Sequence, residues 1–503
     1  MTQKSPNIIL VTTDQQRTDS LSCYGSTFTS TPHLDRLASE GLQFNRAYCA
    51  NPTCTPARAS LFSGLHTSRH GAWNVGTNIP DDLPMLPQML QDAGYRTHAI
   101  GKLHFQAYGS KDSMENCDLW EQRYPDWQGP YYGFETVELA LGHVTYGLRG
   151  HYGAWLKERT SEENYKRFQS ARRLSKGPKF EGDAMDWDLP PELHNSVWTA
   201  DRTIEFLETR PDDKPFFLSV GFQDPHHPHA LPRDFEDRVR VGDVPAPRWV
   251  EGELDDKPPH HHLAHKGNLE GSPYRGDHFI GGQGPGADYS QADAGDARQG
   301  RAYYYSMVKL VDREMGRILD ALEQQGLTEN TLVIFTSDHG ELLGDHGIWL
   351  KGPFPYEELV RIPLLMRFPR EFSGRSPIDG LVSHVDIVPT ILQLLDLPAP
   401  EALDGKNLLP LIKGQTAVNE NVIVGCTDDP SCLRSKTVIT KDRKLTFYHG
   451  HEFGELYDLS ETPRETVNHW FDPKFASEKA ELLSKLLDHS ERLERRAPRT
   501  CYA

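Results

Sequence analysis

The chain has 503 residues, with 54 Lys and Arg against 72 Asp and Glu, so its formal net charge is −18. This acidic balance argues against nucleic acid or an anionic membrane as the main partner, because both attract basic surfaces. Apolar residues make up 37% and aromatic residues 10% of the chain, which excludes disorder as its main state. The length predicts two or three domains.

The sequence offers no candidate transmembrane helix. Its apolar runs, such as Ile8–Val11 and Leu332–Phe335, are far shorter than the ~20 residues that a membrane span needs. The polar residues Met1–Asn7 do not resemble a secretory signal. Seven cysteines are few for this length and odd in number, so no disulfide framework is expected. We therefore expect a cytoplasmic protein.

Short apolar runs rich in β-formers alternate with amphipathic stretches along most of the chain. In chain order, this pattern predicts a strand at Asn7–Thr13, helices at Pro32–Glu40 and Leu83–Ala93, a strand at Gly94–Ile100, a helix at Trp198–Thr209, a strand at Pro215–Phe222, a helix at Tyr303–Gln325, and strands at Thr331–Ser337 and Ile362–Phe368. Such alternation predicts an α/β fold, with a large, mostly parallel sheet sandwiched by helices.

Two regions depart from this alternation. Phe235–Gly300 is rich in Gly, Asp, His and Pro without periodicity, which predicts a long functional or mobile loop. After Leu411 the chain has short strands and a closing helix, predicted at Asn421–Cys426, Thr437–Thr440, Lys444–Tyr448 and Ser477–Arg495. We therefore expect a catalytic α/β domain at 1–411, with a loop insertion at about 235–300, and a C-terminal subdomain at 412–503 made of a small antiparallel sheet and one helix.

Polar residues follow two of the predicted strands. Asp14 and Gln15 come directly after the first strand, and Asp338 and His339 come directly after the strand at Thr331–Ser337. In an open parallel sheet, ligands bind beyond the carboxyl ends of the strands. The four side chains could therefore converge on one cation. For either pair alone, the alternative is that the aspartate caps a following helix.

A cysteine stands at a predicted helix start, in Cys54-Thr55-Pro56-Ala57-Arg58. This position, with an arginine one turn later, predicts a lowered thiol pKa and an anion site. A tyrosine-phosphatase loop does not fit, because its arginine would fall at Ser60. A buried small hydrophobe is the common role of a lone cysteine, but the flanking Pro, Arg and Gly disfavour it here.

These motifs resemble those of the type I sulfatases, the formylglycine-dependent family of the alkaline phosphatase superfamily. Cys54-x-Pro56-x-Arg58, closed by Gly64, resembles the first family signature, and Gly94–His104 resembles the second. Asp14-Gln15, Ser337–Gly340 and Glu455–Leu459 are also similar to family segments, in the right order along nearly the whole chain. Two positions depart from these signatures in ways that the family resemblance tolerates. Ser63 stands where Thr, Ala or Arg is usual, and Leu103 replaces an aromatic residue between Lys102 and His104.

The resemblance implies an alkaline-phosphatase-like fold and hydrolysis of sulfate esters. It implies that a formylglycine-generating enzyme converts Cys54 to formylglycine, whose hydrate is the nucleophile. It also implies one divalent cation, Ca²⁺ or alternatively Mn²⁺, held by Asp14, Gln15, Cys54, Asp338 and His339. The Asp-Gln and Asp-His pairs resemble those of the phosphonate monoester hydrolase branch, whose members use Mn²⁺, and nitrogen ligation favours Mn²⁺ over Ca²⁺.

The remaining catalytic residues follow from the same resemblance. Arg58 would hold the formylglycine hydrate, and His104, oriented by Lys102, would be the base for its second hydroxyl. Pro225-His226-His227-Pro228 resembles the family's Pro-His-x-Pro segment, so His226 is the expected proton donor to the leaving group. Lys351 would bind the sulfate oxygens. Asn78, rather than Asn74, is the expected substrate contact.

Three functions stay open: a sulfate ester hydrolase, a phosphonate monoester or phosphodiester hydrolase on the same scaffold, and a non-catalytic glycan- or metal-binding protein in which Cys54 stays a thiol. The expected partners are a small-molecule or glycan sulfate ester and the maturing enzyme, while homo-oligomer formation stays open.

The histidine run (His260, His261, His262 and His265) could bind metal, but we expect it to be exposed, because it lacks acidic or Cys partners at ligand spacing. The Gly-rich loop at Gly281–Gly286 is not a dinucleotide site, because it follows no predicted strand. Asp345 and His346 are expected to support the pocket near Lys351. The aromatic residues could stack on a ring or a quaternary ammonium, but ordinary loop packing is the expected role of most of them: Trp120, Tyr124, Trp127, Tyr131 and Tyr132.

Overall fold

The computed structural model describes residues 5–174, 183–266, 294–372, 374, 377–415, 417–428, 431–460 and 465–493. Its centre is a seven-stranded sheet in the order β2-β12-β10-β1-β8-β4-β5. The strands are β1 (Asn7–Thr13), β2 (Leu42–Gln43), β4 (Arg96–Gly101), β5 (Thr136–Leu141), β8 (Phe216–Gly221), β10 (Thr331–Ser337) and β12 (Leu364–Arg367). The five strands from β10 to β5 run parallel, while β12 pairs antiparallel with β10 and the short β2 pairs antiparallel with β12. The predicted mostly parallel sheet is therefore confirmed.

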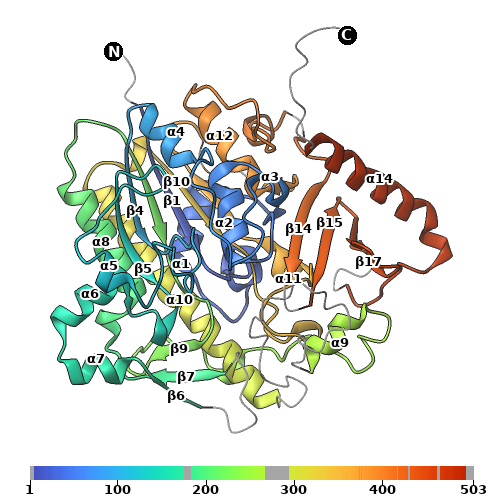
Figure 1. The fold of residues 1–503 in the computed structure, drawn as a ribbon, viewed down its shortest axis with the longest axis horizontal. Coiled ribbons are helices and arrows are strands. Elements are labelled where there is room, and N and C mark those ends of the chain that lie inside the picture. The colour runs from blue at the N-terminus through green and yellow to red at the C-terminus, as the bar shows by residue number, and fades with distance from the viewer. Residues whose placement is uncertain are drawn as a thin grey trace.

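Helices cover both faces of this sheet (Figure 1). Ile8 and Leu10 of β1 pack into one apolar core, whereas Ile9 and Val11 pack into the other. Because successive side chains of a strand point to opposite faces, an all-apolar strand such as β1 needs cover on both sides. The covering and connecting helices are α1 (Pro32–Glu40), α2 (Cys54–Ser63), α3 (Thr67–His70), α4 (Leu86–Asp92), α5 (Trp120–Arg123), α6 (Gly150–Arg159), α7 (Glu162–Phe168), α8 (Asn195–Thr209), α10 (Ala294–Gln324), α11 (Glu357–Val360), α12 (Ile387–Leu394) and α13 (Leu409–Ile412).

The region expected to be one long loop, Phe235–Gly300, contains regular structure. α9 (Pro259–His265) lies within it, and α10 begins at Ala294, nine residues before the predicted start at Tyr303. The prediction was wrong there because Gly and Asp at the start of α10 obscure its helical periodicity. Two small sheets also lacked a sequence signal; their strands are β3 (Ala47–Tyr48), β11 (Arg361–Ile362) and β13 (Val382–Ser383), and β6 (Ala171–Arg173), β7 (Ala184–Trp187) and β9 (His229–Pro232).

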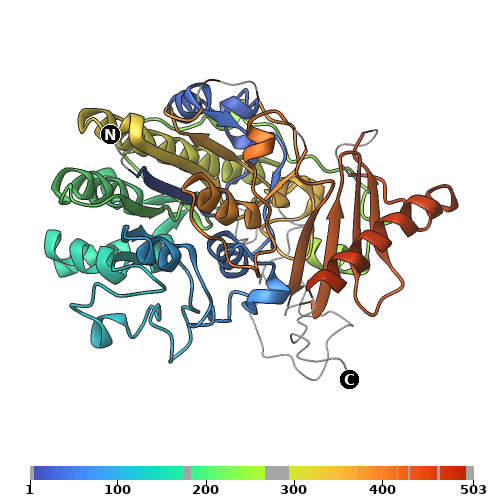
Figure 2. The same ribbon diagram turned by 90° about the horizontal axis from the view of Figure 1, so that it is seen from above.

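The chain closes with a separate antiparallel sheet, as predicted. Its strands are β14 (Val422–Asp428), β15 (Leu433–Ile439), β16 (Arg443–Tyr448) and β17 (Gly454–Asp458). Helix α14 (Ala476–Leu493) lies on the outer side of this sheet, away from the central sheet (Figure 2). Leu482 and Leu486 of α14 pack there against Val438 and Leu445. None of the helices in the described part of the chain is long and apolar enough to cross a bilayer.

Candidate active site

Polar residues follow the carboxyl ends of all five parallel strands, at the same edge of the sheet. β1 leads into Asp14, β10 into Asp338, β8 into Gln223–His226, β4 into Lys102, and β5 into the segment that contains His143. The ends of β4 and β8 approach each other closely, since a Cβ on Gly221 would lie 2.0 Å from the carbonyl oxygen of Lys102. The topology of the sheet thus gathers residues that are far apart in sequence.

Cys54 is the first residue of α2 and is fully buried at this edge. Its Sγ lies 3.6 Å from Asp14 Oδ1, 3.3 Å from His339 Nε2 and 2.8 Å from Lys351 Nζ. Burial raises the pKa of the Cys54 thiol, and the positive charge of Lys351 only partly offsets this effect. The lowered thiol pKa predicted from the helix start is therefore wrong, and a reactive thiolate is disfavoured.

Four donor groups surround one point in the centre of the site. Ligand atoms of Asp14, Cys54, Asp338 and His339 all lie within 4.8 Å of one another, and His339 Nε2 is 3.8 Å from Asp14 Oδ1 and 3.7 Å from Asp338 Oδ1. Burial lowers the pKa of His339 to about 3, so its imidazole is neutral. The side chain of Gln15 lies beside these groups, where its Oε1 accepts a hydrogen bond from Lys351 Nζ at 3.2 Å.

Two buried basic side chains contact the carboxylates of this cluster, although burial lowers the pKa of one of them, Lys102. Arg58 Nε donates to Asp338 Oδ2 at 2.9 Å, and Arg58 Nη1 donates to the carbonyl of Lys102 at 3.1 Å. Burial alone would raise the pKa of Asp338, but His339 and Arg58 outweigh it and lower the pKa. Lys102 Nζ forms an ion pair with Asp14 and also contacts His143 Nε2. Among the described residues, Lys102 makes no hydrogen bond to His104, the residue it was expected to orient.

A buried carboxylate sets the position of His104. Glu115 accepts hydrogen bonds from the backbone N–H groups of His104, Phe105 and Gln106, at 2.7 to 3.2 Å, and from the hydroxyl of Tyr131. His104 itself has a positive φ of 55°, which this network stabilises. Burial lowers the pKa of His104, so its ring is neutral and can accept a proton. Glu115 was not predicted, because it lies in a segment without periodicity.

His226 and Lys351 lie together beside Cys54. Lys351 Nζ is 3.2 Å from His226 Nε2, and the ring of His226 stacks on His143 with 3.6 Å between centroids. Burial lowers the pKa of both His226 and His143. His143 was missed from the sequence, although it follows a strand end as Asp14 does. Recognising the strand at Thr136–Leu141 would have indicated it.

The remaining candidates lie outside this cluster. Asn78 is exposed, and its Oδ1 accepts a hydrogen bond from the backbone N–H of Ala107 at 2.9 Å. Asp345 pairs with Arg17 and Arg301, and His346 pairs with Glu253 at 2.7 Å. The predicted aromatic residues pack on one another, among them Trp120 with Tyr124 and Trp127. The Gly-rich loop at Gly281–Gly286 lies outside the described residues.

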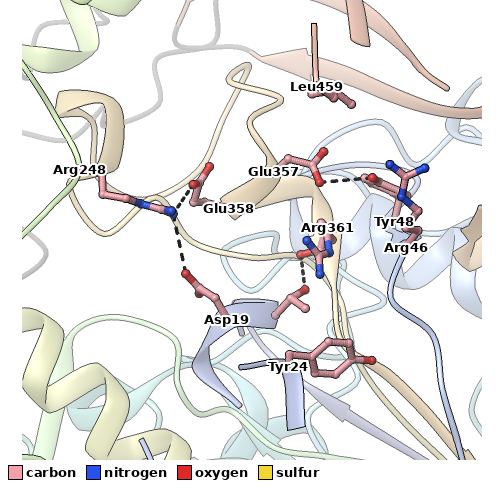
Figure 3. Close-up of a pocket in the computed structure, with 10 residues that line it drawn as sticks. Asp19, Tyr24, Arg46, Tyr48, Arg248, Glu357, Glu358, Arg361 and Leu459 are labelled. Carbon is pink, nitrogen blue, oxygen red and sulfur yellow. Dashed lines mark hydrogen bonds and ion pairs between the residues drawn. The ribbon is translucent and has the colours of Figure 1, made fainter. Parts of the chain in front are cut away.

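A polar cleft lies beside the segment that follows Lys351 (Figure 3). Figure 3 shows Arg248 between Glu358 and Asp19, at 2.5 and 3.8 Å, while the hydroxyl of Tyr48 donates to Glu357 at 3.2 Å. Arg248 thus pairs with two carboxylates, and Glu357 pairs with Lys444 at 2.7 Å. These contacts hold α11, which contains Glu357 and Glu358, in place beside the cleft.

Comparison with known proteins assigns this site to a family. A model of the sulfatase family matches residues 6–397. The chain belongs to the sulfatase family. It is a hydrolase of sulfuric ester bonds, and membership implies a metal ion and a formylglycine in general terms. A second model, of the C-terminal region of N-sulphoglucosamine sulphohydrolase, matches residues 344–492 of this sulfatase.

Individual relatives cover nearly the whole sulfatase. It is 28% identical to the uncharacterized sulfatase YidJ of Escherichia coli, over 97% of this chain and 88% of the relative. It is 32% identical to the multifunctional alkaline phosphatase superfamily protein PehA of Trinickia caryophylli, over 82% of this chain and 77% of that protein. Among solved structures, the phosphonate monoester hydrolase of Agrobacterium radiobacter aligns with a TM-score of 0.80 and 25% identity, over 97% and 96% of the two chains.

Proposed function

We propose that this sulfatase cleaves its ester through a formylglycine at position 54. The observation that carries the proposal is the position of Cys54, whose Sγ lies within 3.6 Å of a carboxylate, an imidazole and an ammonium. A hydrated aldehyde at this position would supply the hydroxyl that attacks sulfur and a second hydroxyl that releases sulfate. A serine could perform only the first half and would stay esterified.

The donor set also fits a divalent cation. Asp14, Asp338 and His339 would hold it, together with the group at position 54, and Gln15, whose Oε1 accepts a hydrogen bond from Lys351 Nζ, would join through its amide oxygen. Two carboxylates favour Ca²⁺, and the neutral imidazole of His339 favours Mn²⁺. When bound, the cation would acidify the nucleophilic hydroxyl and neutralise its charge. We propose Ca²⁺ as the first candidate and Mn²⁺ as the alternative.

The remaining catalytic roles would belong to Arg58, Lys351, His104 and Lys102. Arg58 has one guanidinium nitrogen, Nη2, without a hydrogen-bond partner among the described residues, and this nitrogen could hold the hydrate. Lys351 Nζ, 2.8 Å from the position of the nucleophile, would bind the sulfate oxygens. Neutral His104 would take the proton from the second hydroxyl. Lys102 would neutralise Asp14 rather than orient His104.

The leaving oxygen needs a proton as its bond to sulfur breaks. We assign this proton to the pair of His226 and Lys351: neutral His226, whose Nε2 lies 3.2 Å from Lys351 Nζ, would take a proton from that ammonium and pass it to the leaving oxygen. The sulfate group would bind between this pair and Arg58, and the alcohol would depart on the side of His226. We also propose that Asn78 contacts the substrate. Residues 1–411 would form the catalytic domain, and residues 412–503 a C-terminal subdomain.

A second candidate function is hydrolysis of phosphonate monoesters. The similarity to the Agrobacterium radiobacter enzyme and the presence of Gln15 and His339 in the metal site favour it. Rates on paired aryl sulfate and aryl phosphonate esters with the same leaving group separate the two functions. We expect the sulfate ester to have the higher kcat/KM, and faster turnover of the phosphonate would overturn the assignment.

A further inference from the structure

The histidine run in α9 is buried, contrary to the exposed position expected from the sequence. The side chains of His260 and His261 are fully buried, whereas His262 is exposed and His265 is half-buried. A run of histidines without acidic or Cys partners at ligand spacing indicates an exposed segment. The fold supplies the missing partner, because Glu455 of β17 comes to lie against α9 from nearly two hundred residues away (Figure 1).

We propose that His260, His261 and Glu455 form a second metal site, suited to Zn²⁺ and separate from the catalytic cluster. Their ligand atoms lie within 4.8 Å of one another, and all three residues are buried. His261 Nε2 is 3.5 Å from Glu455 Oε1. Ligands about 2.1 Å from a tetrahedral Zn²⁺ lie roughly 3.4 Å from one another, so this pair already has the required separation.

The hydrogen bonds around the three residues leave the ligand atoms available. His260 Nε2 donates to the carbonyl of Pro353 at 3.2 Å, so its lone pair is on Nδ1, which has no hydrogen-bond partner among the described residues. His261 Nδ1 lies 3.1 Å from the hydroxyl of Tyr356. Metal-bound histidines commonly hold their second nitrogen in this way, which fixes the ring.

The chemistry of the donors also suits a transition metal. Two imidazoles and one carboxylate are a ligand set that Zn²⁺ accepts and that Ca²⁺ and Mg²⁺ avoid. Burial lowers the pKa of both His260 and His261, so both rings are neutral, as ligation requires. Glu455 receives hydrogen bonds from the hydroxyls of Tyr448 and Tyr457, which orient its carboxylate.

The metal site would stabilise the loop that contains Lys351. Pro353 and Tyr356, which hold the two imidazoles, follow Lys351 by two and five residues. A metal ion here would therefore join α9, β17 and this loop. The site is separate from the catalytic cluster, because His260, His261 and Glu455 do not belong to the donor group around Cys54.

The test measures metal content and stability rather than turnover. The full chain is stripped with a chelator, reloaded with Zn²⁺, desalted and analysed for zinc per chain. We expect His260→Gln to hold one equivalent less than wild type, with a loss of affinity of at least about 10–100-fold. Zn²⁺ should raise the Tm of wild type by more than that of this variant. His262→Gln, at the exposed neighbouring position, is the matched control and should behave as wild type.

Loading with Co²⁺ gives an independent readout. Tetrahedral Co²⁺ bound to two imidazoles should give visible absorption bands that wild type and His262→Gln share and His260→Gln lacks. Glu455→Gln, which keeps an oxygen acceptor for one of the two tyrosine hydroxyls and can donate its amide N–H to the other, replaces His260→Gln if that variant fails to fold. Equal zinc content and equal Co²⁺ spectra in wild type and in the ligand variant would overturn the proposal, as would wild type that binds no zinc beyond the catalytic site.

Discussion

Replacing His226 should slow the sulfatase in proportion to how poor its leaving group is. His226 Nε2 lies 3.2 Å from Lys351 Nζ, which in turn lies 2.8 Å from the position of the nucleophile. In the proposed mechanism, Lys351 would still bind the sulfate group in His226→Ala, so substrate binding should be retained while proton donation is lost. Donation by a general acid is worth about 10²–10⁴-fold, or about 3–5 kcal/mol of transition-state stabilisation.

The assay is kcat/KM over a series of sulfate esters whose alcohols span a wide range of pKa. An activated nitrophenyl ester needs little proton donation, so His226→Ala should cost less than about tenfold there. An alkyl or sugar ester should lose the full factor, which steepens the dependence of rate on leaving-group pKa. His227→Ala is the control, because His227 Nδ1 lies 3.3 Å from Gln15 Nε2 rather than beside the nucleophile. An unchanged slope in His226→Ala, or a steeper one in His227→Ala, would refute the assignment of His226.

Four further outcomes are expected. Cys54→Ala should abolish turnover and Cys54→Ser should allow at most one turnover, measured by burst kinetics. Removal of the catalytic cation should abolish activity, and its return should restore it, as followed by elemental analysis. Glu115→Gln should lower the free energy of unfolding by about 1–3 kcal/mol, measured with denaturant, because buried backbone N–H groups lose part of their acceptor. Burial alone would lower the pKa of His346, but Glu253 and Glu358 raise it from 6.5 to about 9. The stabilisation of roughly 3 kcal/mol is therefore complete below pH 6.5 and lost as the pH rises through 9, and His346→Gln should lack this decline.

The sequence contains clear signals for the parts of the site that follow strong strands or specific motifs. β1 and β10 are continuous apolar runs, so the sequence alone places Asp14 and Asp338 at strand ends. Cys54, Arg58 and Lys351 are identified by motif resemblance. Their convergence around one point depends on the parallel order of the strands, which the alternation of helices and strands also predicts.

The parts that were missed depend on contacts between distant segments. His143 follows β5, an edge strand whose alternating pattern was not recognised. Glu115 acts through three backbone N–H groups, and a sequence carries no signal for such contacts. Glu455 meets His261 only because β17 packs against α9, so the ligand spacing of that cluster is absent from the sequence.

Mass spectrometry of the peptide that contains Cys54 tests the central claim most directly. The sulfatase is purified from cells that also make a formylglycine-generating enzyme, digested, and treated with a hydrazide that traps aldehydes. We predict a peptide in which position 54 has lost its sulfur, carries an aldehyde and forms the hydrazone, in proportion to the specific activity of the preparation. A fully active preparation in which position 54 remains an unmodified cysteine would contradict the account.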